Sequence, residues 1–447
     1  MRVRFWGTRG SIAAPGLPTL RHGGNTPCVE VRTDDDTLLI FDCGTGARAL
    51  GLALAQTGPV RAHVFITHTH SDHIQGLPFF VPAFLAGSHL TIYGPAGVDR
   101  SLPHAVGGQM DYAYFPVPIG DLPARVDFEE LGECSFSVGT ARVQAQYLNH
   151  TAPCLGYRLE VGGATLVYAT DHEPYVYPAW RPDRPADAFE VDALLHPGDV
   201  RHAEFLHGAD LVVHDTQYTA AEYPRKVGWG HSPAEYAIDL ALVGRVGRLA
   251  LFHHDPTRDD DALDELLAAS RARVAEAGRQ LHIVAAAEGM EVTIAERAQS
   301  PTAEPGPRAP LVPTRARILV AEDDPDLGPV LEEVLKEDGY EVLRATDGAE
   351  AMRLAAQHAC DLILLDVQMP VLDGFAACRA LRADPRLAAV PIIMLTARSE
   401  DEEVLKGFAE GATDYMIKPF AVAQFRARVR AWLTRGAGAS LAPHGGA

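Results

Sequence analysis

Residues 66–76, with the sequence ITHTHSDHIQG, hold four side chains that can bind metal ions. His68, His70, Asp72 and His73 lie close together and follow an apolar run that is typical of a buried strand. Zinc, manganese and iron all accept imidazole and carboxylate ligands. In a tight loop after a strand, His68 and His70 can face one ion, while Asp72 and His73 can face a second from the start of the next helix. The spacing therefore predicts a site for two divalent cations, which we expect to be zinc, with manganese or iron as alternatives.

The motif HTHSDH within this segment resembles the signature of the metallo-β-lactamase superfamily, whose fold is an αββα sandwich around a dinuclear metal centre. The resemblance covers residues 1–297. It implies three further ligands in chain order, which are a histidine, an aspartate that bridges the two metals, and a last histidine. The candidates for these positions are His150, Asp171 and His253.

Two of these candidates have neighbours that could take their places. His172 adjoins Asp171, which we favour because a ligand shared by two divalent cations must be anionic. His254 adjoins His253, which we favour because the last ligand of the superfamily comes immediately after the final strand. The resemblance also includes the sequence FDCGTG, where it implies that Asp42 braces the metal-binding loops without binding metal.

Two segments are similar to ribonuclease Z-like enzymes of this superfamily and favour phosphodiester chemistry. The sequence DLVVHDTQY at 210–218 resembles their HEAT strand and loop, and GHSPAEYA at 230–237 resembles their GHST segment. The resemblance implies that His231 points into the site, oriented by Asp215, which stands where those enzymes carry glutamate. A protonated imidazole there can stabilise charge on the departing oxygen or donate a proton to it. The alternative is that His231 only caps the helix that starts at Ser232.

The mechanism implied by these residues is two-metal hydrolysis, in which Asp72 orients the attacking hydroxide and His231 assists the leaving oxygen. Residues 1–297 carry 23 basic and 37 acidic side chains, a net charge of −14, and this balance disfavours a long nucleic acid as a partner. We therefore expect a small-molecule ester as substrate, foremost a small phosphodiester such as a cyclic nucleotide. The alternatives are a metallo-lactonase or thioesterase, and a metal-bound scaffold domain without turnover.

The elements that must position these residues are strands and helices in mixed order, which predict an α/β fold with sheets between helical layers. The apolar runs that we expect to be strands are residues 3–7, 28–32, 37–44, 62–68, 90–94, 165–171, 211–215 and 248–254. The clearest helical segments are residues 232–244 and 261–278. Site residues at the ends of such strands lie on loops, where active sites are usually built.

The pattern becomes regular after residue 316, where five short apolar strands alternate with five helices. This alternation predicts a doubly wound, five-stranded parallel sheet, with acidic residues at the carboxyl ends of its strands. The segment 316–435 resembles the receiver domain of two-component signalling, which implies that Asp366 accepts a phosphoryl group. The resemblance further implies magnesium ligands and switch residues, which are Glu322, Asp323 and the carbonyl of Gln368 for magnesium, and Thr396, Tyr415 and Lys418 for the switch. It implies a cognate histidine kinase or phosphotransfer protein as partner, and it is compatible with a homodimer.

The amino-acid composition predicts the domain boundaries and the cellular location of the protein. The 447 residues carry a net charge of −20, and prolines concentrate between residues 299 and 316, which predicts an extended linker. We therefore divide the chain into a hydrolase domain, a linker, a receiver domain and a flexible tail, at residues 1–297, 298–315, 316–435 and 436–447. No apolar run is long enough to span a bilayer, and no segment resembles a signal peptide. The six cysteines are scattered without a CxxC pair, which favours a reducing, cytoplasmic location.

Overall fold

The computed structural model describes residues 1–95, 100–175, 197–295, 316–384, 386–387, 390–396, 410–420, 422, 425–426, 428–430 and 432–433. These residues form two compact units, one within residues 1–308 and the other mainly within residues 309–447. The proposed linker 298–315 and tail 436–447 lie outside the described residues. Among the described residues, no helix is long and apolar enough to cross a membrane.

The first unit contains two seven-stranded sheets of mixed direction. In the first sheet, the strands from β14 to β3 pair antiparallel and those from β3 to β6 pair parallel. Its spatial order is β14 (Glu291–Thr293), β1 (Arg2–Gly7), β2 (Cys28–Arg32), β3 (Leu38–Phe41), β4 (Arg61–Phe65), β5 (His89–Pro95) and β6 (Arg125–Leu131).

The second sheet is parallel at one end and antiparallel at the other. Strands β10 to β13 run parallel, whereas β7 to β10 form an antiparallel meander. Its order is β13 (His282–Ala285), β12 (Arg248–Phe252), β11 (Leu211–Asp215), β10 (Ala164–Ala169), β9 (Leu155–Val161), β8 (Ala141–Tyr147) and β7 (Cys134–Val138).

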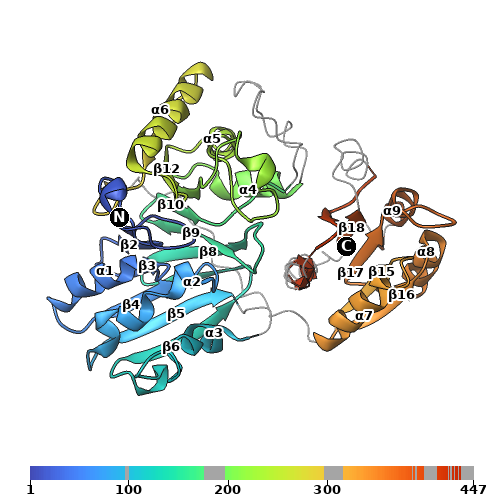
Figure 1. Cartoon of the computed structure of the whole chain (residues 1–447), viewed down its shortest axis with the longest axis horizontal. Helices are drawn as coiled ribbons and strands as arrows, with labels where there is room; N and C mark the ends of the chain where they lie inside the picture. The colour runs from blue at the N-terminus through green and yellow to red at the C-terminus, as the bar shows by residue number, and fades with distance from the viewer. Residues whose placement is uncertain are drawn as a thin grey trace, which may run out of the picture. The chain divides into compact units, whose positions relative to one another are not determined.

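The two sheets pack face to face and helices cover their outer faces, as the blue and green-to-yellow parts of Figure 1 show. The core between the sheets includes Phe41 and Phe65 from the first sheet and Tyr157, Tyr168 and Phe252 from the second. Two further apolar clusters lie between each sheet and its helices. The helices are α1 (Gly46–Ala55), α2 (Ser71–Ile74) and α3 (Leu102–Gly108) on the first sheet, and α4 (Pro197–Leu206), α5 (Ala234–Val243) and α6 (Asp260–Glu276) on the second. This arrangement is the expected αββα sandwich.

Several strands end earlier than the apolar runs suggested. The run 165–171 forms a strand only to Ala169, and the run 248–254 forms one only to Phe252. The backbone turns into the left-handed region at Asp171 (φ 59°) and His253 (φ 57°), and this conformation cannot continue a strand. The residues just beyond the strands are therefore free to turn toward a common site.

The structure contains strands that the sequence analysis did not identify, namely β6 to β8, β13 and β14. Strands β7 and β8 form a hairpin in which buried residues alternate with polar ones, and Gly139 (φ 56°) makes the turn between them. Such short alternating strands lack a continuous apolar run, and they are identified only by the neighbours with which they pair.

The second unit has a five-stranded, all-parallel sheet in the order β16-β15-β17-β18-β19, as expected for a doubly wound fold. The strands are β15 (Arg317–Ala321), β16 (Glu341–Ala345), β17 (Leu362–Asp366), β18 (Ile392–Thr396) and β19 (Asp414–Ile417). The described helices are α7 (Leu327–Glu337), α8 (Gly348–Gln357) and α9 (Gly374–Arg382). The other two expected helices fall wholly or partly outside the described residues.

Candidate metal centre

The candidate ligands lie at one edge of the sandwich, where strands of both sheets end. Strand β4 of the first sheet leads into the loop that carries the HTHSDH motif, and β8, β10 and β12 of the second sheet lead to the other three candidates. These strands point the same way within each sheet, because β10 and β12 run parallel to β11 and β8 lies two antiparallel steps from β10. Loops from the two sheets can therefore meet at this edge.

Asp171 lies at the middle of the cluster, with its two carboxylate oxygens facing different histidines. The Nε2 atoms of His68 and His150 both lie 3.9 Å from Oδ1 of Asp171. The Nε2 atoms of His73 and His253 lie 3.2 Å and 3.4 Å from Oδ2. The carboxylate thus divides the site into two halves, as a bridging ligand would.

Each half gains one more candidate ligand from the HTHSDH loop. His70 joins the first half, with its Nδ1 atom 3.3 Å from Nε2 of His150. Asp72 joins the second half, where its Oδ2 atom lies 3.3 Å from Nε2 of both His73 and His253. Several sets of potential ligand atoms lie mutually within 4.8 Å, among them His68 with His70 and His150, His68 with His73 and Asp171, and Asp72 with His73 and His253.

The cluster suits a pair of cations. The Nε2 atoms of His68 and His73 are buried and have no hydrogen-bond partner among the described residues. A buried polar atom without a partner is costly, and a bound cation would satisfy both of these nitrogens. Six of the seven candidate ligands are buried, whereas His70 is exposed, so the site is open to solvent on the side of His70.

The pKa shifts of four of these side chains favour the protonation state that binds metal. Burial lowers the pKa of His68, and it lowers that of His150 to about 3, so both imidazoles are neutral at pH 7. Burial alone would raise the pKa values of Asp72 and Asp171, but the surrounding histidines hold both well below the usual range. Neutral imidazoles and ionised carboxylates are the ligating forms.

A second group of residues fixes the orientation of the ligands. Asp42 Oδ2 lies 2.8 Å from Nδ1 of His73, and it accepts a hydrogen bond of 2.9 Å from the hydroxyl of Tyr168. Asp42 Oδ1 accepts the backbone N–H of Thr67 at 2.8 Å. Asp42 therefore braces the metal-binding loop from the neighbouring strand, in the role expected for it. The oxygen of Gln217 lies 3.1 Å from Nδ1 of His253 and orients this histidine in the same way.

The two neighbours that could have replaced these ligands point elsewhere. Nδ1 of His172 lies 3.3 Å from the backbone nitrogen of Asn149, whose N–H it accepts. Nε2 of His254 lies 2.9 Å from the carbonyl oxygen of Ala286, to which it donates. Asp171 and His253 therefore occupy the cluster, and their neighbours serve the surrounding structure.

His231 lies at the edge of the cluster and is paired with Asp215. Nδ1 of His231 is 2.9 Å from Oδ2 of Asp215 and 3.7 Å from Oδ1 of Asp171. Burial alone would lower the pKa of His231, but the Asp215 carboxylate outweighs it and raises the value to about 9. Helix α5 begins after Pro233 and has no side-chain cap, so His231 does not act as a helix cap.

The glycine-rich turn at 7–11 contacts the site from the first sheet. The backbone N–H of Ser11 donates to Oδ2 of Asp72 at 2.8 Å. A Cβ atom on Gly10 would lie 2.4 Å from Nδ1 of His253, so a larger residue there would displace this ligand. The turn therefore supports the candidate ligands through its backbone.

The sequence analysis missed a set of buried histidines directly behind the cluster. The rings of His172 and His202 stack with centroids 3.8 Å apart, and Nε2 of His202 lies 2.9 Å from Nε2 of His214. His214 Nδ1 donates to the carbonyl of Asp215 at 2.7 Å. Because these residues come from α4 and from the ends of β10 and β11, no local pattern in the sequence brings them together.

The predicted phosphorylation site occupies the carboxyl edge of the parallel sheet in the second unit. Lys418 Nζ lies 2.7 Å from Oε2 of Glu322 and 3.0 Å from Oδ2 of Asp366. Thr396 ends β18 and accepts the backbone N–H of Lys418 at 2.7 Å through its carbonyl. Burial raises the pKa of Glu322 to about 7, with Lys418 opposing the rise and Asp366 adding to it.

The other residues expected at this site lie on the same edge or beside it. Asp323 is exposed directly after Glu322, and the N–H of Gln368 donates to Oδ1 of Asp366 at 3.3 Å. Tyr415 is buried in β19. An acidic pocket with one lysine is able to hold a divalent cation together with a phosphoryl group.

The sequence matches two protein families, and the two matches divide the chain in the same way as the structure. Residues 37–254 match the family described as Beta-lactamase superfamily domain, and residues 318–430 match the Response regulator receiver domain. The chain joins a metallo-β-lactamase superfamily domain to a response regulator receiver domain.

The receiver domain is similar to curated proteins and to solved structures. It is 44% identical over 119 residues to the DNA-binding dual master transcriptional regulator RpaA of Synechocystis, a match that covers 27% of this chain and 49% of that protein. The chain thus spans about half the length of such curated relatives. It is also 34% identical to the chemotaxis protein CheY4 of Vibrio cholerae, covering 26% of this chain and 97% of that chain with a TM-score of 0.26.

The metallo-β-lactamase domain is similar in fold to human tRNase Z, short form (ELAC1). The two are 20% identical, and the match covers 66% of this chain and 100% of that chain with a TM-score of 0.44. At this identity the likeness concerns the fold alone, and the reaction must be argued from the site.

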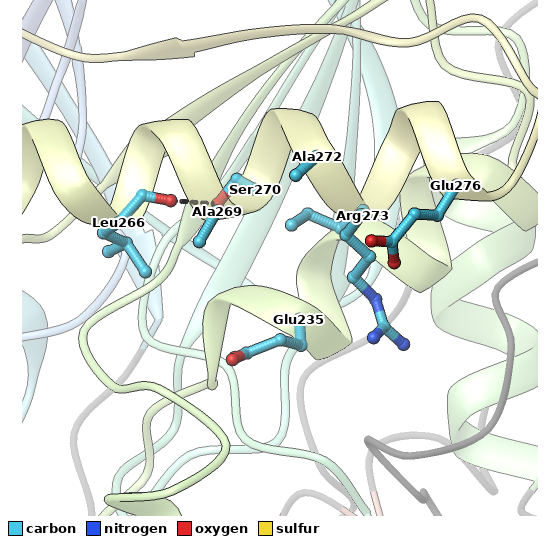
Figure 2. A pocket seen from close by; sticks show the side chains of 8 residues that line it. Glu235, Leu266, Ala269, Ser270, Ala272, Arg273 and Glu276 are labelled. Carbon is cyan, nitrogen blue, oxygen red and sulfur yellow. Dashed lines mark hydrogen bonds between the residues drawn. The ribbon is translucent and has the colours of Figure 1, made fainter.

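A separate hollow of about 280 Å³ lies between α5 and α6 of the metallo-β-lactamase domain. Figure 2 shows Glu235 on α5 facing Ser270, Arg273 and Glu276 on α6. Arg273 is held by two hydrogen bonds, of 2.9 Å and 2.7 Å, to the carboxylate of Asp239. None of the candidate metal ligands lines this hollow.

Proposed function

We propose that the metallo-β-lactamase domain is a dinuclear metal-dependent hydrolase of a small phosphodiester, such as a cyclic nucleotide, and that the receiver domain controls it. The observation that carries this proposal is the position of Asp171, whose two oxygens face two separate groups of histidines. His68, His70 and His150 would hold one cation, and Asp72, His73 and His253 would hold the other. Two such cations would activate a water molecule and polarise the ester.

The residues of the chain supply the remaining chemistry. Asp72 is ionised and lies beside the second group of histidines, where it can orient the attacking water through its carboxylate. His231 is held by Asp215, whose carboxylate raises its pKa and so favours the protonated imidazole. A protonated imidazole at this position can donate to the oxygen that leaves.

The pairing of His231 with Asp215 supports a phosphodiester, or another ester with an alkoxide leaving group, over a thioester. An alkoxide that leaves phosphorus is a poor leaving group, and its departure is aided by a proton donor. A thiolate needs less help, because its pKa is lower. The acidic balance of residues 1–297 supports a substrate that presents few phosphates.

The experiment that tests this proposal combines metal analysis with a substrate panel. The purified full chain should contain two divalent cations in its first domain, and it should hydrolyse cyclic nucleotides or bis(p-nitrophenyl) phosphate faster than lactones and thioesters. Treatment with a chelator should abolish the activity, and zinc or manganese should restore it. Faster turnover of lactones or thioesters would reassign the reaction. Two bound ions without turnover of any of these esters would identify a metal-bound scaffold.

For the receiver domain we propose that Asp366 accepts a phosphoryl group from a histidine kinase or phosphotransfer protein. Glu322, Asp323 and the carbonyl of Gln368 would hold magnesium, and Lys418 would neutralise the phosphoryl oxygens. The position of Lys418 between Glu322 and Asp366 supports this assignment. Thr396 and Tyr415 would then respond to the phosphoryl group and pass the signal on.

A further inference from the structure

The segment 223–231, which we call the strap, runs beside the metal centre and ends at His231. Apart from a short 3-10 turn at its start, it forms no regular element. Its backbone is left-handed at Gly228 (φ 85°) and Gly230 (φ 87°). A segment of this kind has few hydrogen bonds of its own and needs outside contacts to hold one conformation.

Glu173 supplies such contacts. Its side chain is buried, and its Oε1 atom accepts the hydroxyl of Tyr223 at 2.9 Å and the backbone N–H of Gly228 at 2.6 Å. Its Oε2 atom accepts the N–H of Gly230 at 2.9 Å. Hydrogen bonds to an ionised carboxylate are about twice as strong as those between neutral groups. Glu173 therefore fastens the strap at three points.

The same residue belongs to the segment that carries the central ligand. Glu173 follows Asp171 by two residues, and its own N–H donates to the carbonyl of Asn149 at 2.8 Å. Asn149 immediately precedes His150, and its side-chain amide donates back to the carbonyl of Glu173 at 2.9 Å. The segments that bear Asp171 and His150 are thus joined at Glu173.

The strap in turn determines the orientation of His150. Nδ1 of His150 donates to the carbonyl of Gly230 at 2.8 Å, which leaves Nε2 directed toward Asp171. A Cβ atom on Gly230 would lie 2.2 Å from Nδ1 of His150, so the approach requires glycine at this position. The next residue along the strap is His231. A shift of the strap would therefore disturb a candidate ligand and the proposed proton donor together.

We propose that Glu173 is a positioning residue, which holds the strap so that His150 presents Nε2 to the metal and His231 faces the substrate. The part that concerns His231 rests on the proposed hydrolysis, whereas the part that concerns His150 rests only on the proposed binding of metal. Loss of a group that orients a metal ligand weakens metal binding by about 10-fold to 100-fold. The corresponding variant is Glu173→Gln, which keeps the shape but opposes an NH₂ group to the N–H groups of the strap.

The first test uses the scarcity of lysine in the first domain. Lys226 lies within the strap and is the only lysine in the first 335 residues. A lysine-specific protease can therefore produce the fragment 1–226 only by cutting the strap. We expect Glu173→Gln to release this fragment from the native full chain at least ten times faster than the wild type does. Glu130→Gln is the matched control, because Glu130 also accepts a backbone N–H, that of Leu102 at 2.6 Å, but at the start of helix α3 and not in the strap.

The second test measures metal affinity by competition with a chelator, so it does not depend on any enzymatic activity. Glu173→Gln should bind zinc 10-fold to 100-fold more weakly than the wild type, and Glu130→Gln should match the wild type. A third measurement uses saturating metal and a substrate from the panel. Glu173→Gln should lower kcat, because His231 is misplaced. It should leave KM within about threefold, because the residues outside the strap are unchanged.

The outcomes separate this proposal from the proposed function. Unchanged cleavage after Lys226, or faster cleavage with unchanged zinc affinity, would overturn the role of Glu173. A protein that hydrolyses no ester would defeat the proposed function and still leave both of these tests decisive. If Glu173→Gln does not fold, Tyr223→Phe removes one of the three hydrogen bonds and should show the same two effects at smaller size.

Discussion

The side chain of Asp171 reaches the cluster because the backbone at this residue adopts the left-handed conformation. Its φ of 59° is unusual for a residue other than glycine, and Asp42 (φ 57°) and His253 (φ 57°) share the conformation. Such a residue costs about 1–3 kcal/mol, which the surrounding structure must offset. All three follow strands, and the left-handed turn directs each side chain to the cluster. Strained backbone at three residues of this edge is typical of a functional site.

The role of Asp42 leads to a prediction about metal affinity. Asp42→Asn should weaken zinc binding by about 10-fold to 100-fold, because the amide is a poorer acceptor for Nδ1 of His73 and for the hydroxyl of Tyr168. Competition with a chelator measures this effect. The exposed Asp36 lies in the turn between β2 and β3, and Asp36→Asn should bind zinc as the wild type does. Equal affinity in the two variants would show that Asp42 does not brace the ligand.

The role of His231 can be tested by comparing kcat for substrates with a poor and a good leaving group. For a diester with a poor leaving group, such as a cyclic nucleotide, His231→Gln should lower kcat by about 10²-fold to 10⁴-fold with the metal content unchanged. For bis(p-nitrophenyl) phosphate the loss should be much smaller, because p-nitrophenolate leaves without a proton. Steady-state kinetics with both substrates measures the difference. Equal losses would argue against proton donation, and no loss with either substrate would show that His231 takes no part in the hydrolysis.

Among the individual site residues, the sequence predicted those that lie close together in the chain. The HTHSDH ligands come from one loop, so their spacing alone indicates a metal site, and the resemblance supplied His150, Asp171 and His253. The choice between His253 and His254 depends on a backbone angle that no residue pattern specifies. Glu173 could not be found, because its partners in the strap lie 50 to 57 residues away in the chain.

Helix α4 and the ends of strands β10 and β11 enclose a set of neutral histidines. Burial lowers the pKa values of His202 and His214, and for His202 the neighbouring His214 lowers it further. Both imidazoles are therefore uncharged in the folded domain. The network they form packs directly behind the segments that carry Asp171 and Asp215.

These histidines make stability depend on pH. In the unfolded chain a histidine binds a proton below a pH of about 6.5, whereas a buried neutral histidine does not, so stability falls as the pH drops below this value. Each such residue contributes up to about 1.4 kcal/mol per pH unit. Between pH 6 and pH 5, the free energy of unfolding of the wild type should fall more steeply with falling pH than that of His202→Gln. The difference corresponds to about one proton bound on unfolding. Urea unfolding at several pH values measures the slope.

The control for this experiment is the exposed His104. His104→Gln makes the same substitution at an exposed position and so reports any effect of the exchange that does not depend on burial. An unaltered slope in His202→Gln would mean that His202 is not held neutral.

The elements themselves were predictable where one face or both faces of a strand are apolar. Eight apolar runs became strands, and the two clearest helical segments became α5 and α6. Strands β7 and β8 were missed, since polar residues interrupt their apolar ones. All five strands of the receiver sheet were found, because a parallel sheet buried on both faces requires continuous apolar runs.

At the scale of the whole molecule, a phosphorylatable domain is fused to one with a metal centre. We predict that acetyl phosphate with magnesium changes the hydrolytic rate of the full chain several-fold, in keeping with coupling of about 1–3 kcal/mol in allosteric proteins. Asp366→Asn should not respond, because it lacks the carboxylate that accepts the phosphoryl group. Steady-state rates before and after treatment test this. Identical rates for the wild type, the treated wild type and Asp366→Asn would show that the receiver domain does not control hydrolysis.

The candidate ligands are drawn from both sheets of the sandwich, with four on the loop after β4 and three on loops of the opposite sheet. Bound cations would therefore cross-link the two layers much as a disulfide joins two strands, but reversibly. Resistance to heat would then rise and fall with the supply of metal, because an ion that binds only the folded state stabilises it. A cell deprived of that metal would lose this protein by unfolding and degradation as well as by inactivity.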